Sequence, residues 1–385
     1  MKFIHLSDLH IGKSLGDFNL IKDQEYILDE IVVMADAEKV DAVMIAGDVY
    51  DKSIPSEEAV KLFDRFICKL AELSIKVFII SGNHDSDIRL GFASSLLEKN
   101  NIFLSTVYDG KMHNYEIEDE YGKVNIYLLP FVKASQVRSH FPDVQIDNYE
   151  DALRCVIGAA DVDYSNRNML LAHQFVTGKG EDPKLSGSES PITQNVGLVE
   201  KIDVGVFDGF DYVALGHIHS PQQISKPEVR YAGSPLKYSL SEAGHIKSVP
   251  LVTVGAKGMI NIELKELQPL RDLRHIKGKM DSLLAKESVE ATDDFIYVTL
   301  TDEDIIMDAM GIVRQYYPNV VKIDYDNSRV KDIDKVDITK LATEKSFDEL
   351  VRDFYRQMYG VEMSEDELAV MRMVGGKAGV IDETD

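Results

Sequence analysis

The chain has 385 residues, and its 42 lysines and arginines stand against 66 aspartates and glutamates, which makes the formal net charge −24. This acidity argues against a broad basic surface for nucleic acid, although bound metal ions could still supply positive charge locally. The two cysteines exclude a disulfide-rich secreted scaffold. No apolar run approaches the ~20 residues that a membrane span needs, so we expect a cytoplasmic protein that does not contact a membrane.

Strand-like and helical segments alternate from the start of the chain, which predicts an α/β fold. Continuous apolar runs at 3–6, 42–46 and 76–80 are typical of strands buried on both faces, and amphipathic helices are predicted between them at 20–37 and 57–73. Further strands are predicted at 124–129, 168–172, 212–215, 230–232, 250–254 and 259–264. We therefore expect the first domain, a layered α/β sandwich, to comprise residues 1–270.

The pattern of the sequence changes after Pro269. The next predicted elements are a helix near 276–286, a strand at 295–300, a helix at 302–317 and a strand at 320–325. Together they predict a second, small α+β domain over residues 271–335.

The last part of the chain, residues 340–385, predicts a helix-loop-helix. Apolar residues with the spacing of one helix face are Phe347, Leu350, Val351, Phe354, Tyr355 and Met358. Ser346 with Glu349, and Ser364 with Glu367, form capping-box patterns that predict the starts of two helices. Gly360 predicts the end of the first helix.

Five short polar clusters follow strand-like runs. They are Asp8 and His10; Asp48 and Asp51; Asn83, His84 and Asp85; His173; and His217 and His219. A single histidine or Gly-Asp pair is a weak signal, because most such residues are structural. Ligands of α/β sheets collect at the carboxyl ends of the strands, so we expect the five clusters to converge. Jointly they predict a metal site.

The residue types indicate which chemistry this site supports. Carboxylate, imidazole and one amide ligand suit divalent manganese or iron, and the absence of cysteine ligands argues against structural zinc. Two ions need a bridging ligand, and Asp48, which is central in the set, is the natural bridging carboxylate. Two metal ions a few ångströms apart can bind a phosphodiester, activate a water and stabilise the leaving oxygen. The sequence therefore predicts phosphoester hydrolysis.

The motifs DLH, GDVYD, GNHD, LLAHQF and GHIH are similar to the signature of the calcineurin-like metallophosphoesterases. More specifically, the segments AGDVYDKSIPS, SGNHDS, AHQFVTGKG, YVALGHIHSPQ and YAGSPLKYSLSE resemble the SbcD family, the nuclease subunits of bacterial SbcCD complexes. The resemblance covers the first 240 residues well, and the remainder only in organisation. It implies a four-layer αββα sandwich, followed by a small α+β capping domain and a C-terminal helix-loop-helix.

The resemblance also implies roles for individual residues. One metal ion would be held by Asp8, His10, Asp48 and His219, and the other by Asp48, Asn83, His173 and His217. His84 would be the acid or orienting group that assists departure of the ribose oxygen. Asp51 stands where archaeal and eukaryotic relatives have a histidine, so its role is open between positioning water or a ligand and capping a loop.

The implied activity is that of a manganese-dependent double-strand DNA exonuclease and hairpin endonuclease of the cytoplasm and nucleoid, acting in DNA repair, recombination and replication. The implied partners are an SbcC-type ATPase, which the helix-loop-helix would bind, and a second copy of the chain. The homodimer would use the helices at 57–73 and 89–99, with Leu62, Phe66 and Leu96 as apolar candidates. Periodicity shows only that each helix has an apolar face, which the chain's own core could use entirely. Two alternatives stay open: a stand-alone phosphodiesterase or phosphatase on small substrates, and a non-catalytic scaffold.

Overall fold

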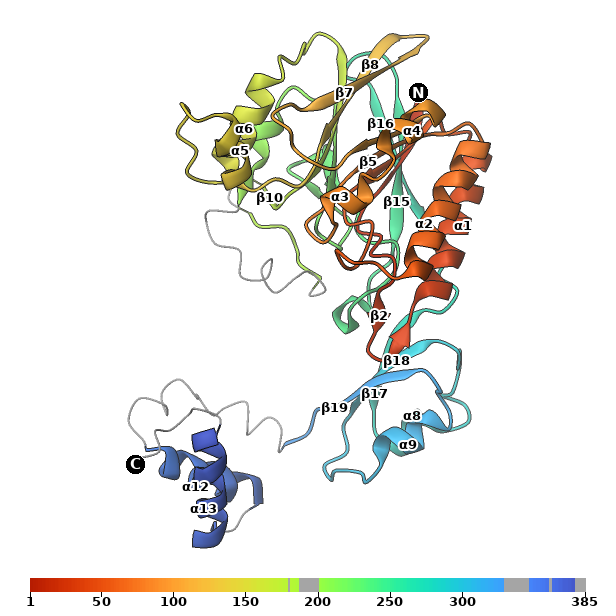
Figure 1. Ribbon diagram of the computed structural model, residues 1–385. Helices are drawn as coiled ribbons and strands as arrows, with labels where there is room; N and C mark the ends of the chain where they lie inside the picture. Colours follow the sequence, from red (N-terminus) through yellow and green to blue (C-terminus); the bar gives the residue numbers. More distant parts are fainter. Residues whose placement is uncertain (179–180, 187–200, 329–345, 360–361, 378–385) are drawn as a thin grey trace. The chain divides into compact units, whose positions relative to one another are not determined.

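The computed structural model describes residues 1–178, 181–186, 201–328, 346–359 and 362–377. It confirms the predicted α/β sandwich, in which two six-stranded sheets pack against each other (Figure 1). The described residues divide into two compact units. Unit 1 is Met1–Lys277, Asp281–Val298 and Asp308–Ile323, and unit 2 is Gly278–Met280, Thr299–Met307 and Asp324–Asp385. The three-domain division predicted from the sequence stays a prediction.

The first sheet contains four parallel strands that are joined by helical crossovers. In spatial order its strands are β16 (Ile260–Glu266), β15 (Ser248–Val254), β1 (Lys2–Leu6), β4 (Ala42–Ala46), β5 (Lys76–Ile80) and β6 (Ile102–Ser105). β1, β4, β5 and β6 run parallel, whereas β15 is antiparallel to β1. The helices α1 (Ile21–Ala37) and α2 (Glu57–Glu72) cover the outer face of this sheet (Figure 1). The predicted strands at 42–46 and 76–80 are confirmed.

The second sheet has the same design. In spatial order its strands are β13 (Gln222–Ile224), β14 (Lys226–Tyr231), β12 (Tyr212–Gly216), β9 (Arg167–His173), β8 (Gly122–Leu129) and β7 (His113–Asp119). β8, β9, β12 and β14 are parallel. The helices α5 (Ala134–His140) and α6 (Tyr149–Ala159) cover its outer face. Shorter strands are β2 (Ser14–Leu15), β3 (Phe18–Asn19), β10 (Val176–Thr177) and β11 (Ile202–Asp203).

The inner faces of the two sheets form one apolar core, which fixes how the two sheets pack together. Phe3, Met44 and Phe78 of the first sheet pack with Ile126 and Met169 of the second, and all five are buried. Close packing of this kind is stabilised by burial of about 2 kcal/mol per large apolar side chain. The two sets of parallel strands are therefore held at a defined separation, and the loops at their ends are placed accordingly.

A third sheet follows in the chain, with β17 (Leu273–Gly278), β18 (Phe295–Leu300) and β19 (Val320–Tyr325) in this order. The strands at 295–300 and 320–325 are confirmed, but the helix predicted at 276–286 is wrong. Residues up to Gly278 continue β17, whose side chains alternate in burial as in a half-buried strand, and only α8 (Met280–Leu283) is helical. Pairing along the sheet outweighs the helical pattern of the sequence.

The helix predicted at 302–317 is also wrong in length, because α9 comprises only Ala309–Arg314. Asp308 has a left-handed backbone, with φ 51°, and its carboxylate accepts the N–H of Gly311 at 3.2 Å, so the helix begins after it. The Asp302 carboxylate instead accepts the N–H of Met280 at 2.9 Å. Side-chain hydrogen bonds to the backbone therefore compete successfully with the helix over 302–308.

The helix predicted at 89–99 is broken into α3 (Asp87–Leu90) and α4 (Ser94–Leu97). Ala93 has φ 62°, which interrupts the helix between them. The expectation that Leu62 and Phe66 of α2 are available to a partner is wrong as well, because they are 2% and 1% exposed in the core beneath the first sheet. Leu96, in contrast, is 63% exposed.

At the end of the chain, α12 (Phe347–Tyr359) and α13 (Glu365–Lys377) confirm the predicted helix-loop-helix. Both capping boxes are present: Ser346 N–H donates to Glu349 Oε2 at 2.9 Å, and Ser364 N–H donates to Glu367 Oε2 at 2.9 Å. The predicted helix end at Gly360 lies outside the described residues. No helix in the described part of the chain is long and apolar enough to cross a membrane.

Candidate metal centre

The five polar clusters converge, as the sequence predicts, at the carboxyl ends of β1, β4 and β5 in one sheet and β9 and β12 in the other. Two adjacent loops are joined backbone to backbone: the N–H of Asp8 donates to Gly47 O at 3.0 Å, and the N–H of His10 donates to Asp48 O at 3.0 Å. All seven candidate ligands, Asp8, His10, Asp48, Asn83, His173, His217 and His219, lie in this one region.

The backbone of this region is strained. Asp8, His10 and Asp48 have φ 52°, 43° and 52°, and His217 has φ 106°. Side chains with a Cβ rarely adopt these values, and each such residue costs about 1–3 kcal/mol. Strain of this size persists only where surrounding contacts over-determine the conformation, and four of the candidate ligands carry it.

Two glycines allow the sheets to approach each other at the site. A Cβ on Gly216 would lie 1.9 Å from Ala46 O, and a Cβ on Gly47 would lie 2.3 Å from His173 Nδ1. Gly47 also has φ 86°, which an L side chain rarely adopts. The absence of side chains at these positions lets His173 donate from Nδ1 to Ala46 O at 2.8 Å, which leaves its Nε2 directed at the other candidate ligands.

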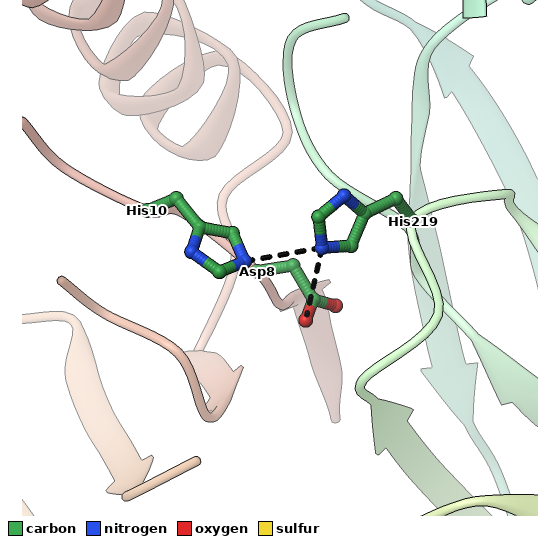
Figure 2. Close-up of side chains that lie close together, drawn as sticks. All are labelled: Asp8, His10 and His219. Atoms are coloured by element: carbon green, nitrogen blue, oxygen red, sulfur yellow. Dashed lines mark hydrogen bonds and ion pairs between the residues drawn. The ribbon is translucent and has the colours of Figure 1, made fainter. Parts of the chain in front are cut away.

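A first group of donors is formed by Asp8, His10 and His219 (Figure 2). His10 Nε2 lies 3.1 Å from His219 Nε2, which in turn lies 4.0 Å from Asp8 Oδ1. Asp48 Oδ2 lies 3.5 Å from His10 Nε2. All four side chains are buried.

A second group shares Asp48 with the first. Asp48 Oδ2 lies 3.4 Å from His173 Nε2, which lies 3.1 Å from Asn83 Oδ1. Asn83 Oδ1 lies 2.8 Å from His217 Nδ1. One oxygen of Asp48 therefore faces both groups, which is the geometry of a bridging carboxylate.

The residues present fit a pair of divalent ions. Metal–ligand bonds of about 2.1 Å at right angles place neighbouring ligand atoms about 3.0 Å apart, close to the separations between the donors here. The Nε2 atoms of His10 and His219 lie 3.1 Å apart. Burial lowers the pKa of both rings, so both are neutral and their two lone pairs can face one cation. The donors are carboxylate and amide oxygens and imidazole nitrogens, a set that suits manganese or iron.

In the absence of metal ions, two of the candidate ligands, Asp8 and His173, have raised pKa values. Burial raises the pKa of Asp8 to about 7. Burial alone would lower the pKa of His173, but the Asp48 carboxylate beside it outweighs this and raises the pKa to about 9. Burial would also raise the pKa of Asp48, yet His173 and the other histidines hold it well below its usual range. Burial lowers the pKa of His10 and of His217 to about 3.

Because protons on Asp8 and His173 occupy candidate ligand atoms, metal binding should be linked to pH. These pKa values make His173 protonated and Asp8 partly protonated at neutral pH, and a divalent ion held by both would displace both protons. The apparent affinity for Mn²⁺ should therefore rise as the pH is raised from 6 to 9, by about tenfold per pH unit for each group that is still protonated. The rise should be steeper below about pH 7, where both Asp8 and His173 contribute, than above it, where only His173 does. Calorimetry in two buffers of different ionisation enthalpy measures the number of protons released. An affinity that is constant over this range would contradict the prediction.

His84 and Asp51 lie beside the donors in a different arrangement. The N–H of His84 donates to Asp48 Oδ1 at 2.9 Å, and His84 Nδ1 lies 3.1 Å from Asp51 O. The His84 ring is only half-buried. The carboxylate of Asp51 accepts from Lys13 Nζ at 2.7 Å, and its Oδ1 lies 3.6 Å from His10 Nδ1. This distance is too long for a hydrogen bond, and His10 Nδ1 is a buried atom without a hydrogen-bond partner among the described residues. Asp51, His10 and His84 together form a third group of donor atoms that lie within 4.8 Å of one another.

Asp85 belongs to the same motif as Asn83 and His84 but has a structural role. Its carboxylate accepts the N–H groups of Gly82, Val49 and Tyr50 at 2.9, 3.1 and 2.9 Å, which ties the loops after β4 and β5 together. Burial, reinforced by the charge of Asp48, raises its pKa to about 6. A Gly-Asn-His-Asp turn gives no local sign of this long-range contact.

Three further residues, to which the sequence assigned no role, contact the backbone of the segments that bear His10 and His219. They are Gln24, Tyr238 and Lys247. All three are buried. The only signal for Gln24 is an amide on the buried face of the predicted helix at 20–37. Tyr238 lies in the segment YAGSPLKYSLSE, which carries part of the family resemblance but assigns it no role, and Lys247 has no signal.

Comparison with known families and structures gives two family matches and a likeness to a solved structure. Residues 1–221 match the family described as calcineurin-like phosphoesterase. Residues 269–359 match the SbcD_C family, described as type 5 capsule protein repressor C-terminal domain. A crystal structure of a dimetal phosphatase from Danio rerio is similar at 11% sequence identity and a TM-score of 0.38, over 69% of this chain and 96% of that one.

Proposed function

The chain belongs to the calcineurin-like phosphoesterase family, and we propose that this member is a manganese-dependent DNA nuclease of the SbcD type. The observation that favours a nuclease over an enzyme for small phosphate esters is the match of residues 269–359 to the SbcD_C family, downstream of the phosphoesterase region. Residues 271–335 would form a cap that directs DNA to the site, and residues 340–385 would bind the partner.

In this proposal one divalent ion is held by Asp8, His10, Asp48 and His219. The second is held by Asp48, Asn83, His173 and His217. Two such metal ions would supply a water-derived nucleophile at neutral pH and would neutralise the charge of the phosphodiester.

The remaining chemistry belongs to His84. Its Nδ1–H donates to Asp51 O at 3.1 Å, which leaves Nε2 as the ring atom that faces the reaction. The imidazolium form of His84 would give its Nε2 proton to the departing ribose oxygen and become neutral. Its backbone N–H holds Asp48 Oδ1 at 2.9 Å, so the acid and the bridging carboxylate are placed together. The Asp51 carboxylate, which accepts from Lys13 Nζ at 2.7 Å, would help to position a water or a ligand beside His10 and His84.

We propose that α12 and α13 dock on an SbcC-type ATPase. The pair is held by its own contacts, since Tyr355 OH donates to Glu367 Oε1 at 2.6 Å and Arg372 pairs with Asp348. Exposed apolar side chains remain on both helices, with Phe354 62% and Met373 55% exposed. These side chains support an interface that excludes water.

We also propose that the chain forms a homodimer through the segment that contains α3 and α4. Ile88 and Phe92 are 84% and 81% exposed, and with Leu96 they form an apolar set in place of the buried Leu62 and Phe66. The double substitution Ile88→Glu with Phe92→Glu should convert a dimer to a monomer in light scattering after gel filtration. Val33→Glu on α1, at another exposed apolar position, is the matched control and should remain dimeric. A dimeric double variant would refute this interface.

The nuclease proposal is tested with the purified full chain, end-labelled linear duplex and hairpin DNA, and a small chromogenic phosphodiester. Each substrate is incubated with Mn²⁺, with Mg²⁺ or without metal, and Asp48→Asn serves as the inactive control. Cleavage of DNA with Mn²⁺ that the control lacks supports the proposal. Turnover of the small ester while DNA stays intact, even after the ATPase partner is added, would identify a stand-alone phosphodiesterase instead.

A further inference from the structure

Two buried polar clusters lie directly behind His10 and His219 and contact the backbone of both segments. The first is formed by Gln24 of α1 and by Tyr238. Gln24 Nε2 donates to His10 O at 2.8 Å and lies 3.2 Å from Tyr238 OH, and Tyr238 OH donates to Leu9 O at 2.5 Å. Gln24 Oε1 accepts the N–H of Gly12 at 2.9 Å, so the loop is held on both sides of His10.

The second cluster holds the segment that bears His219. Lys247 Nζ donates to His219 O at 2.9 Å and to Ser234 Oγ at 2.9 Å, and it forms a buried ion pair with Glu242. The other oxygen of Glu242 accepts the N–H of Tyr238 at 3.3 Å. The two clusters are therefore one connected network, which runs from the His10 loop through Tyr238 to His219 although these segments are some two hundred residues apart in the chain.

The hydrogen bonds described above join the network to the first of the two donor groups. They reach His10 and His219, whereas His173 in the second group is oriented by Ala46 O at 2.8 Å. His10 also has the strained φ of 43°. Tyr238 holds the carbonyl group of Leu9, which precedes His10, and Gln24 holds the carbonyl group of His10 itself. Holding these carbonyls compensates the strain before any ion is bound.

We infer that Gln24, Tyr238 and Lys247 are positioning residues that preorganise the His10 and His219 ligands of the first donor group, so that they raise the affinity of one metal ion more than that of the other. This inference rests on the proposed function. None of the three side chains needs to touch an ion or a substrate. Each acts through the backbone of a ligand segment, which fixes the direction of the imidazole ring. Outer contacts of this kind typically change metal affinity by about 10–100-fold.

The test is Tyr238→Phe in the full chain. This substitution keeps the ring, whose centroid lies 5.8 Å from that of His10 and 6.1 Å from that of His219, and removes only the hydroxyl group. Tyr212→Phe is the matched control, because Tyr212 is equally buried and its OH lies 3.0 Å from His5 Nδ1 in the core between the sheets. Mn²⁺ binding is measured by calorimetry, and thermal unfolding in EDTA reports on folding.

The wild type and Tyr212→Phe should each bind two ions, and the affinity for each ion should be the same in the two proteins. Tyr238→Phe should weaken one of the two ions by about 10–100-fold and leave the other within about twofold. Gln24→Met should weaken the same ion, which keeps the inference testable if Tyr238→Phe folds poorly. If Tyr238→Phe and Gln24→Met both bind the two ions with wild-type affinities, the positioning role is refuted, whereas the metal centre itself is not. Failure of the wild type to bind two ions would refute the metal centre, and with it the proposed function.

Discussion

Replacing His84 with glutamine should lower DNA cleavage by about 10²–10⁴-fold while two metal ions remain bound. The size of the effect follows from the loss of the proton that assists departure of the ribose oxygen. Metal binding should survive, because Asn83 and Asp48 provide the ligand atoms and the backbone N–H of residue 84 still donates to Asp48 Oδ1. Glutamine is close to histidine in size and cannot deliver a proton at neutral pH.

The measurement combines Mn²⁺ stoichiometry by calorimetry with cleavage rates on end-labelled duplex DNA. His113→Gln is the matched control, since His113 is a half-buried histidine on β7 whose Nε2 lies 3.2 Å from Asp109 Oδ2, and the substitution should change neither quantity. Loss of metal from the His84 variant would show that this side chain is a ligand and not the acid. Unchanged cleavage would remove it from the reaction altogether.

Replacing Asp48 with asparagine should have a larger effect, with loss of at least one of the two ions and a fall in cleavage of at least about 10³-fold. One oxygen of this carboxylate lies 3.5 Å from His10 Nε2 and 3.4 Å from His173 Nε2, so it is shared between the two donor groups. The amide has the same shape but lacks the negative charge that two adjacent cations require. It also removes the anion that sustains the raised pKa of His173.

Asp211→Asn provides a control with the same change of charge. Asp211 is buried, and its carboxylate accepts the N–H of Asn168 at 2.8 Å near the start of β9, at the opposite end of the strand from His173. This variant should bind two ions and cleave DNA at the wild-type rate. Two ions bound with unchanged affinity to Asp48→Asn would exclude Asp48 as the bridge, whereas loss of metal from both variants would point to a general effect on folding.

Several elements follow directly from local sequence. The strands at 42–46, 76–80, 295–300 and 320–325 coincide with their predicted ranges, because continuous or alternating apolar residues between turn residues have few other stable solutions. The capping boxes at Ser346 and Ser364 are equally local, since each motif satisfies its own orphan N–H groups within four residues.

Other segments were decided by contacts that are distant in the chain. Residues 273–278 carry a helical pattern in part but form β17, because an adjacent strand offers hydrogen bonds along its whole length. The strand β7 was not predicted, although its side chains alternate in burial, because HNYEIED has few strongly apolar residues. Periodicity also indicated an apolar face on α2 without distinguishing a partner from the chain's own core, and the packed sheet buries Leu62 and Phe66.

The same division holds for the candidate site. The identities of its donors and their placement just after strands are properties of the sequence, because parallel strands bring their carboxyl ends to one edge in any α/β sheet. The shared position of Asp48 Oδ2, the place of Asp51 beside His10 and the network of Gln24, Tyr238 and Lys247 exist only in the folded chain. Tyr238 OH meets Leu9 O across 229 positions of sequence, and a local pattern carries no information about such a contact because packing of the whole domain creates it.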